Sequence, residues 1–279
     1  MIKLLLKINL TIVILLSPFV EGKDQVREPW ENNEVFAINK EAAHATLFPF
    51  QSRDAALINN KEQSDNFMLL NGLWKFDWQR SPKNTPKGFE AVNFNDDNWE
   101  QIPVPGNWET EGFGYPIYLD ERFPFTTTWP DAPKEYNPIG SYRKPFTLPK
   151  SWKNKQVFLH VGAAKSSLDV WLNGKKVGFS QGSKTPAEFD LTSYIKGNEN
   201  LLAFQIRRWT DASYLESQDM LRISGIERDV YLYATRKQHI FDFHAKPTLN
   251  NNFSEGNLAV DITLKNFATK KSIQKVEIK

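Results

Sequence analysis

Apolar and polar side chains alternate along several short segments in the middle of the chain. Trp74, Phe76 and Trp78 alternate with Lys75 and Asp77, which is the period of two expected for a strand with one buried face. Three more segments have strand-like apolar patterns: QVFLHV at 156–161, SLDVWL at 167–172 and NLLAFQI at 200–206. These patterns predict a chain built mainly from β-strands.

The stretch SLDVWLNGKKVGFSQG carries the signature of a tight hairpin. Its centre is Asn173-Gly174, a dipeptide favoured in type I′ turns because both residues tolerate positive φ. Leu168, Val170 and Leu172 precede the turn on one face, and Val177 and Phe179 follow it on the return strand. An antiparallel pair is therefore predicted here.

Helical periodicity of normal length is nearly absent, and only LTSYIKGNEN at 191–200 reads as a single helical turn. The chain also has 16 prolines, which suit a strand-rich fold with long loops. We predict an all-β fold, with a jelly-roll β-sandwich over residues 61–236. Residues 23–60 show no sustained period and are expected to form an extended arm on its surface.

A new set of strands is expected from residue 237 to 279. LAVDITL alternates Leu258, Val260, Ile262 and Leu264, and the segments IFDFHAKPTL and SIQKVEIK flank it. Only 43 residues follow position 236, whereas an immunoglobulin-like sandwich needs ~100. This region is interpreted as the start of a truncated immunoglobulin-like sandwich, which suggests that the chain is a fragment.

The first 22 residues resemble a signal peptide. Lys3 and Lys7 precede an apolar run from Ile8 to Phe19, and cleavage is expected after Gly22. The alternative, a membrane anchor, would need ~20 apolar residues, and the run is shorter than that. The mature protein is expected to be periplasmic or extracellular, with no membrane attachment after cleavage.

Composition excludes several classes of function. A net charge of +2 gives no electrostatic basis for nucleic-acid binding. Without cysteine, the chain has no disulfide, no thiolate nucleophile and no Cys-ligated metal. The usual dinucleotide, phosphate-loop and serine-hydrolase motifs are absent, and its four histidines show no HxxxH spacing. Most of the nine tryptophans, such as Trp74, Trp78 and Trp171, are expected in the core rather than in a sugar-stacking platform.

The segment RWTDASYLESQDMLRISGIERD, at 208–229, is much longer than most connections between two strands. Its carboxylates suit two interpretations. Two of them could form a glycosidase pair, spaced ~5 Å or ~6.5–9.5 Å apart according to mechanism. Alternatively, they pair with nearby arginines, because an unpaired buried carboxylate is costly. The second interpretation pairs Glu216, Asp219, Glu227 and Asp229 with Arg207, Arg208, Arg222 and Arg228.

Several long segments resemble the N-terminal region of lac-type β-galactosidases of glycoside hydrolase family 2. In chain order they are VPGNWETEGFGYPIY, NPIGSYRKPFTLP, VWLNGKKVGFSQGSKTPAEFDLT and RWTDASYLESQDMLRISGIERDVYL. ENNEVFAINKEAAHAT resembles the segment that opens these enzymes. The similarity runs over residues 29–279, almost the whole mature chain.

The resemblance implies a sugar-binding jelly roll, then an immunoglobulin-like domain, then a (β/α)₈ barrel that this chain does not reach. The family is retaining and uses two barrel glutamates, one as nucleophile and one as acid and base. No residue here has that catalytic role, so the chain alone is expected to be inactive. A Mg²⁺ ion, if bound, would belong to the missing barrel.

The resemblance implies a role at the family's galactoside site for two residues of this chain. Asp211 stands in the family's RW[ST]D motif, whose Asp contacts galactosyl hydroxyls and helps to ligate Na⁺, so its side chain is expected to point outward. Asp120, in PIYLDERFPF, stands where the family usually has a sugar-binding Asn. This change removes an amide donor and puts the preference for galactose at that position in question.

Three functional hypotheses follow. In the first, the chain supplies substrate-binding loops to a catalytic barrel, in cis or in trans, for hydrolysis of terminal β-galactosides or related glycans. In the second, it is a free-standing carbohydrate-binding module, which would need an exposed aromatic platform. In the third, it is the non-functional product of a truncated gene.

Overall fold

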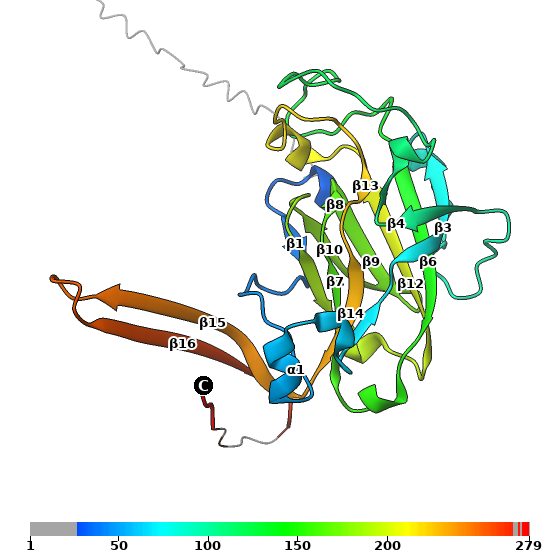
Figure 1. Ribbon diagram of the computed structural model, residues 1–279. Coiled ribbons are helices and arrows are strands. Elements are labelled where there is room, and N and C mark those ends of the chain that lie inside the picture. Colours follow the sequence, from blue (N-terminus) through cyan, green and yellow to red (C-terminus); the bar gives the residue numbers. More distant parts are fainter. Residues whose placement is uncertain (1–26, 270–272, 274, 279) are drawn as a thin grey trace, which may run out of the picture.

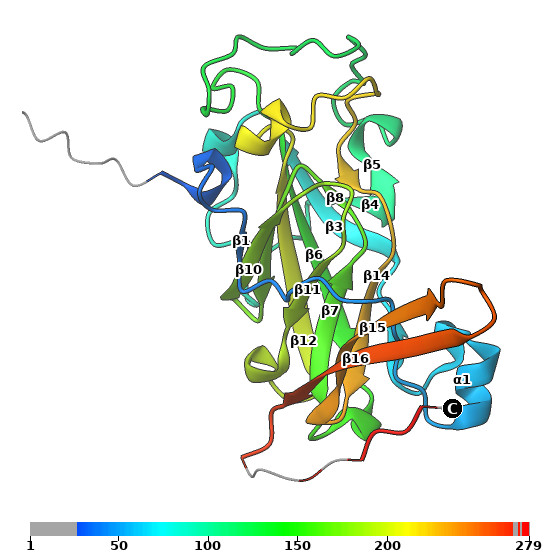
Figure 2. The same cartoon turned by 90° about the vertical axis from the view of Figure 1, so that its left-hand side faces the viewer.

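The computed structural model describes residues 27–269, 273 and 275–278; the predicted signal peptide, residues 1–22, lies outside them. Two antiparallel sheets face each other as a sandwich (Figures 1 and 2). The larger sheet has the order β1 (Ala37–Ile38), β10 (Lys175–Gln181), β9 (Ser167–Leu172), β12 (Glu199–Arg207), β6 (Ile139–Thr147), β3 (Gly72–Gln79), β4 (Glu100–Val104). The smaller sheet has the order β11 (Ala187–Asp190), β7 (Gln156–Val161), β14 (Val230–Thr235), β2 (Phe67–Leu69).

Two smaller sheets complete the fold. The first joins β5 (Gly106–Asn107), β13 (Gly225–Ile226) and β8 (Ala164–Lys165), and the second is the hairpin of β15 (Gln238–Leu249) and β16 (Gly256–Asn266). The helices are short: α1 (Arg53–Ile58) and the 3₁₀ turns η1 (Pro29–Glu31), η2 (Lys61–Gln63), η3 (Pro82–Asn84), η4 (Trp108–Thr110), η5 (Lys150–Trp152), η6 (Thr192–Tyr194) and η7 (Asp211–Tyr214). No helix among the described residues is long and apolar enough to cross a membrane.

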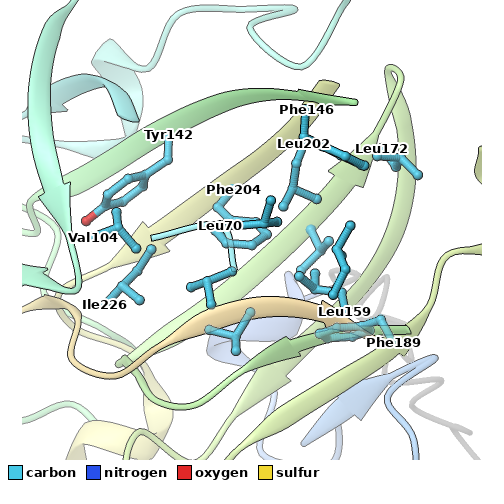
Figure 3. Packing of buried hydrophobic residues seen from close by; sticks show 14 of the residues in the cluster. Leu70, Val104, Tyr142, Phe146, Leu159, Leu172, Phe189, Leu202, Phe204 and Ile226 are labelled. Carbon is cyan, nitrogen blue, oxygen red and sulfur yellow. The ribbon is translucent and has the colours of Figure 1, made fainter. Parts of the chain in front are cut away.

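The predicted all-β sandwich is confirmed, and its core consists of the apolar positions that alternate in the sequence. Phe204 and Leu202 on β12 point across the interior toward Leu159 on β7 and Phe189 on β11, and all four are fully buried (Figure 3). Each such side chain contributes about 1.5–3 kcal/mol by leaving water. The jelly-roll connectivity and the domain boundaries remain predictions.

The predicted hairpin forms between β9 and β10. Asn173 and Gly174 have φ values of 53° and 80°, as a type I′ turn requires. A register shift follows between Lys176 and Gly178. A Cβ at Gly178 would lie 2.4 Å from the carbonyl oxygen of Ile38, so the glycine lets β1 pair closely with β10.

The described part of the predicted arm, residues 27–60, is mostly irregular but includes one short helix that was not predicted. It contains α1, which begins after Ser52, whose side chain accepts a hydrogen bond from the Ala55 N–H, and ends at Asn59 in the left-handed conformation. A helix of six residues is too short to show an apolar period, so no periodic pattern predicts it.

The hairpin of β15 and β16 confirms two of the three strands expected after residue 236. In SIQKVEIK, the described residues 275–278 form no strand, so that expectation is wrong. The apolar residues of β16 are in phase, but Leu258 and Leu264 are 64% and 48% exposed, and Val260 and Ile262 are only partly buried. Together with the arm, the hairpin borders an apolar cavity of about 620 Å³. The immunoglobulin-like assignment remains a prediction.

A largely buried carboxylate attaches the arm to the outer face of the smaller sheet. Glu188 on β11 accepts hydrogen bonds from Tyr233 at 2.7 Å and lies 2.9 Å from His44 and 2.6 Å from His160. Burial favours a higher pKa for Glu188, but these three hydrogen bonds outweigh burial and lower the pKa to about 2. The Glu188 hydrogen bond in turn raises the pKa of His44.

We predict that Gly140→Ala destabilises the sandwich by about 1–3 kcal/mol, because a Cβ there would lie 2.6 Å from Trp108 and 2.7 Å from Phe76. Urea unfolding measures the change. Gly256→Ala is the control, since its Cβ would meet nothing closer than 3.7 Å and should change stability by less than about 0.5 kcal/mol. Equal effects of the two substitutions would contradict this packing.

We predict that His44→Gln lowers stability in a pH-dependent way. Because the folded pKa of His44 is raised, its contribution is fully present below about pH 6.5 and is lost as the pH rises through the folded pKa. The groups that face His44 are Glu188, Asp242 and the carbonyl of Ala45. The loss should be about 1.5 kcal/mol at pH 5.5 and smaller at pH 8, measured by urea unfolding.

The control for this pH dependence is His244→Gln, because His244 is exposed on β15. Its substitution should leave stability unchanged at both pH values. A loss in His44→Gln that is the same at pH 5.5 and pH 8 would show that the charged form of His44 does not hold the arm.

Candidate functional site

Two long loops, residues 108–138 and 208–229, meet at the end of the sandwich that lies uppermost in Figure 1. The guanidinium of Arg208 is buried between them and forms an ion pair with Glu109 at 3.4 Å. It also donates to the carbonyl of Tyr115 at 3.0 Å and to that of Arg222 at 2.7 Å. The long connection is therefore an ordered loop.

The carboxylates of the 208–229 loop do not pair with its arginines, so the predicted pairing is wrong. Their partners come from other elements. Glu216 accepts from Ser183, Asp219 from Tyr118 at 2.6 Å, Glu227 pairs with Lys184, and Asp229 accepts from Asn71 at 2.9 Å.

The loop arginines bind carbonyl oxygens instead. Arg222 donates to the carbonyls of Glu216 and Asp120, both at 3.0 Å, and Arg228 donates to that of Lys184. A non-repetitive loop leaves many carbonyls without ladder partners, and a guanidinium with five donors can satisfy several of them at once. Unpaired carbonyls therefore explain Arg222 and Arg228, whereas Arg208 combines carbonyl contacts with its ion pair to Glu109.

Asp211 is the first residue of η7, and Thr210 caps this turn by exchanging hydrogen bonds with Ser213. The Asp211 side chain is 3% exposed and thus buried, contrary to the expectation that it points outward. Its Oδ1 accepts from Gln181 Nε2 at 2.7 Å and from the Ala212 N–H at 2.9 Å. Oδ2 takes part in neither bond.

Asp211 lines a pocket of about 230 Å³ between η7, the end of β10 and the arm. Asn32 and Phe36 of the arm contribute to its lining, and so do Trp129 and Leu215 from the two loops. Phe36, Trp129 and Leu215 give the pocket apolar walls. Its polar lining comes from the buried Asp211 carboxylate, from Glu216 and from the amides of Asn32, Asn33 and Gln181. Apolar walls with a few polar groups are a common composition of small-molecule sites.

Burial raises the pKa of Asp211, while the hydrogen bond from Gln181 opposes this shift and the nearby charge of Glu31 adds to it. The ionised carboxylate would therefore be stabilised by a cation or by hydroxyl donors. Among the described residues, no group of three or more His, Asp or Glu side chains could hold a metal ion. Asp211 offers one hard oxygen ligand, and a Na⁺ ion would need further oxygens from elsewhere.

Asp120 lies in an exposed turn with a φ of 59°, a conformation that Asp and Asn adopt more readily than most residues. Its carbonyl binds Arg222, and its side chain is not part of the pocket lining. The structure thus links the backbone of Asp120 to the 208–229 loop but does not bring the two predicted site residues into one pocket.

Gln181 and Trp129 are pocket residues that the sequence did not indicate. Gln181 ends a predicted strand, and its contact with Asp211 joins positions 30 residues apart in sequence. Trp129 is 52% exposed, in contrast to the core position expected of most tryptophans. The lack of a two-residue period around TTTWPD was the available signal that this residue is not in a core strand.

The architecture and pocket define a strand-rich sandwich domain with a small site between its loops. The family model described as "Glycosyl hydrolases family 2, sugar binding domain" matches residues 67–236. The chain belongs to this family, which confirms the predicted relationship.

Sequence relatives carry the name β-galactosidase. One from Priestia megaterium is 41% identical over 243 residues, which are 85% of this chain and 24% of the relative. One from Vibrio vulnificus strain YJ016 is 40% identical over 243 residues, 85% of this chain and 23% of the relative. The chain thus spans about a quarter of the length of these relatives.

Solved structures with a similar fold include other glycosidases. A β-glycosidase from Bacteroides vulgatus has a TM-score of 0.55 and 26% identity over 73% of this chain and 25% of that protein. A β-glucuronidase from Bacteroides uniformis has a TM-score of 0.56 and 26% identity over 72% of this chain and 22% of that protein. Each match covers only a minor part of its protein. Among the residues described here, no (β/α)₈ barrel is present.

We predict that Asp211→Asn leaves stability at pH 7 unchanged or higher, because the amide oxygen can still accept from Gln181 and Ala212. Since the folded pKa of Asp211 is raised, its unfavourable ionisation is absent well below pH 3.8 and fully present above the folded pKa. Any gain in Asp211→Asn should therefore grow with pH. Urea unfolding at pH 4 and pH 7 measures it.

Asp211→Ala removes the acceptor and should cost about 1–3 kcal/mol at both pH values. Asp97→Asn, at an exposed position, is the control for loss of one negative charge. If Asp211→Asn is as damaging as Asp211→Ala, the carboxylate is required for folding and its burial is not a strain on the fold.

Proposed function

We propose that this chain is the N-terminal, sugar-binding part of a retaining β-galactosidase and acts on terminal β-D-galactosides together with a catalytic barrel. The observation that carries the proposal is the buried Asp211 carboxylate in the small loop pocket. The β-galactosidase relatives, at 40–41% identity, support this substrate over the glucuronides suggested by structural neighbours at 26%.

The chain's own role is to bind and orient sugar. Oδ2 of Asp211 accepts hydrogen bonds from galactosyl hydroxyls, and Gln181 holds Oδ1 so that the carboxylate keeps one orientation. Asp120 stands where the family usually has an Asn. An ionised Asp can only accept hydrogen bonds, whereas the Asn amide can also donate, so this position favours hydroxyl donors of the sugar. Bond cleavage belongs to two carboxyl groups about 5–5.5 Å apart on the barrel, as retention requires.

A sodium ion fits this proposal as a bridge between chain and sugar. Asp211 would be its ligand from this chain, and the ion would supply positive charge that offsets the burial of the carboxylate. Mg²⁺ is assigned to the barrel, and no residue here is proposed for it. The signal-like N-terminus supports export to the periplasm or the extracellular space.

A free-standing carbohydrate-binding module is the second candidate. It is favoured by the exposed aromatic side chains of Phe36 and Trp129 at the pocket wall. Measurable sugar affinity of the isolated chain, combined with no gain of hydrolysis on joining it to a barrel, would favour the module. A product of a truncated gene would show neither property.

We predict that the chain completes an active enzyme when it replaces the matching N-terminal segment of the Priestia megaterium β-galactosidase. Asp211→Asn in this chimera should lower kcat/KM for a chromogenic β-galactoside about 10- to 150-fold, because a hydrogen bond to a charged group is worth about 1.5–3 kcal/mol. The isolated chain should show no turnover.

Asp97→Asn in the same chimera is the matched control and should retain full activity. The proposal fails if Asp211→Asn also retains full activity, or if the isolated chain hydrolyses the substrate at an enzymatic rate.

A further inference from the structure

We propose that Trp129 is the stacking surface of the Asp211 pocket and binds the apolar face of a single pyranose ring. This inference rests on the proposed function and deepens it, because it names the chain's own determinant for the sugar ring. Trp129 lines the same pocket as Asp211, and 52% of its surface is exposed. The pocket lining thus contains both a large apolar side chain, Trp129, and a buried carboxylate, Asp211.

The indole is held in place by Tyr214. The two rings meet edge to face, with centroids 5.1 Å apart and planes at 86°. This contact occupies one part of the indole and restrains its rotation. Since 52% of Trp129 is exposed, much of its surface stays accessible to a ligand, and a ring that is already restrained loses less entropy on binding.

The Tyr214 hydroxyl also closes the turn that carries Trp129. It accepts from the Thr128 N–H at 3.0 Å and donates to the Asp131 carbonyl at 2.9 Å, on either side of the indole. Asp131 N–H donates to the Thr128 carbonyl at 2.8 Å. Tyr214 is therefore a positioning residue for Trp129.

Asp211 and Tyr214 are the first and last residues of the same 3₁₀ turn, η7. One short helical turn thus fixes both the carboxylate and, through Tyr214, the indole. Because Tyr214 contacts Trp129, η7 determines how far the Asp211 carboxylate lies from the indole. Asp211 and Trp129 themselves are 82 positions apart in sequence. Such coupling suits a ligand that needs both contacts at once.

A pyranose has this combination of surfaces. Its hydroxyls donate hydrogen bonds to a carboxylate, and its ring carries apolar C–H groups that pack on an aromatic face. In galactose the axial 4-hydroxyl leaves H3, H4 and H5 on one face, which makes that face more apolar than in glucose. A volume of 230 Å³ is below the ~300–1,000 Å³ of sites for drug-sized ligands and suits one ring.

The test measures binding of methyl β-D-galactoside to the whole chain by calorimetry, and by saturation-transfer NMR that identifies the ligand protons in contact. Wild type should bind, with the strongest transfer to H3, H4 and H5. Trp129→Ala should weaken binding about three- to tenfold and remove this pattern, and Trp129→Phe should weaken it less. Methyl β-D-glucoside should bind more weakly than the galactoside to wild type.

Tyr214→Phe keeps the ring and removes the hydroxyl that closes the turn. It should lower the ratio of galactoside to glucoside affinity, which a purely structural loss would leave unchanged. Leu221→Ala is the control for an exposed apolar side chain of the same loop, outside the pocket, and should bind as wild type does. Thermal unfolding confirms that each variant is folded.

Wild-type affinity in Trp129→Ala, together with weaker binding in Asp211→Asn, would overturn the role of Trp129 and leave the proposed function intact. Weaker binding in Trp129→Ala but not in Asp211→Asn would support Trp129 and contradict the role given to Asp211. No binding by wild type up to 50 mM ligand, about fifty times a Kd of about 1 mM, would overturn the stacking surface.

Discussion

The buried ion pair of Arg208 and Glu109 is the contact on which the loop end of this domain depends. The guanidinium of Arg208 is 2% exposed, and its two terminal nitrogens donate to carbonyls from both long loops, while its Nε has no partner among the described residues. It therefore fixes the two loops relative to each other. Asp211 follows only three residues later, so the position of the pocket carboxylate derives from this buried cation.

The largely buried carboxylate of Glu188 has the corresponding role on the smaller sheet. Glu188 gathers two histidines and a tyrosine, and through His44 it binds an arm that has little core of its own. In both places a charged group is surrounded by hydrogen-bond partners from segments distant in sequence. Such groups do not add apolar burial, but they specify where irregular segments lie.

The strands were predictable because their information is local. The alternation around Phe204 and the Asn173-Gly174 turn each determine structure within a few residues. The loop contacts were not predictable from local patterns. Glu216 binds Ser183 and Gln181 binds Asp211, and each contact joins residues about thirty positions apart. The composition of the loop suggested arginine partners for its carboxylates instead. The resemblance identified Asp211, but its burial follows from packing that no single segment encodes.

The arm that borders the pocket contributes little to the core, and this has an evolutionary consequence. Phe36 lines the pocket wall while 59% of its surface is exposed, so substitutions there alter ligand contacts at small cost to folding. The floor, with Asp211 and Gln181, is buried and hydrogen-bonded, so substitutions that remove these bonds cost more folding free energy than substitutions of Phe36. Ligand choice in this domain can therefore diversify through its N-terminal segment while the carboxylate and its support stay constant.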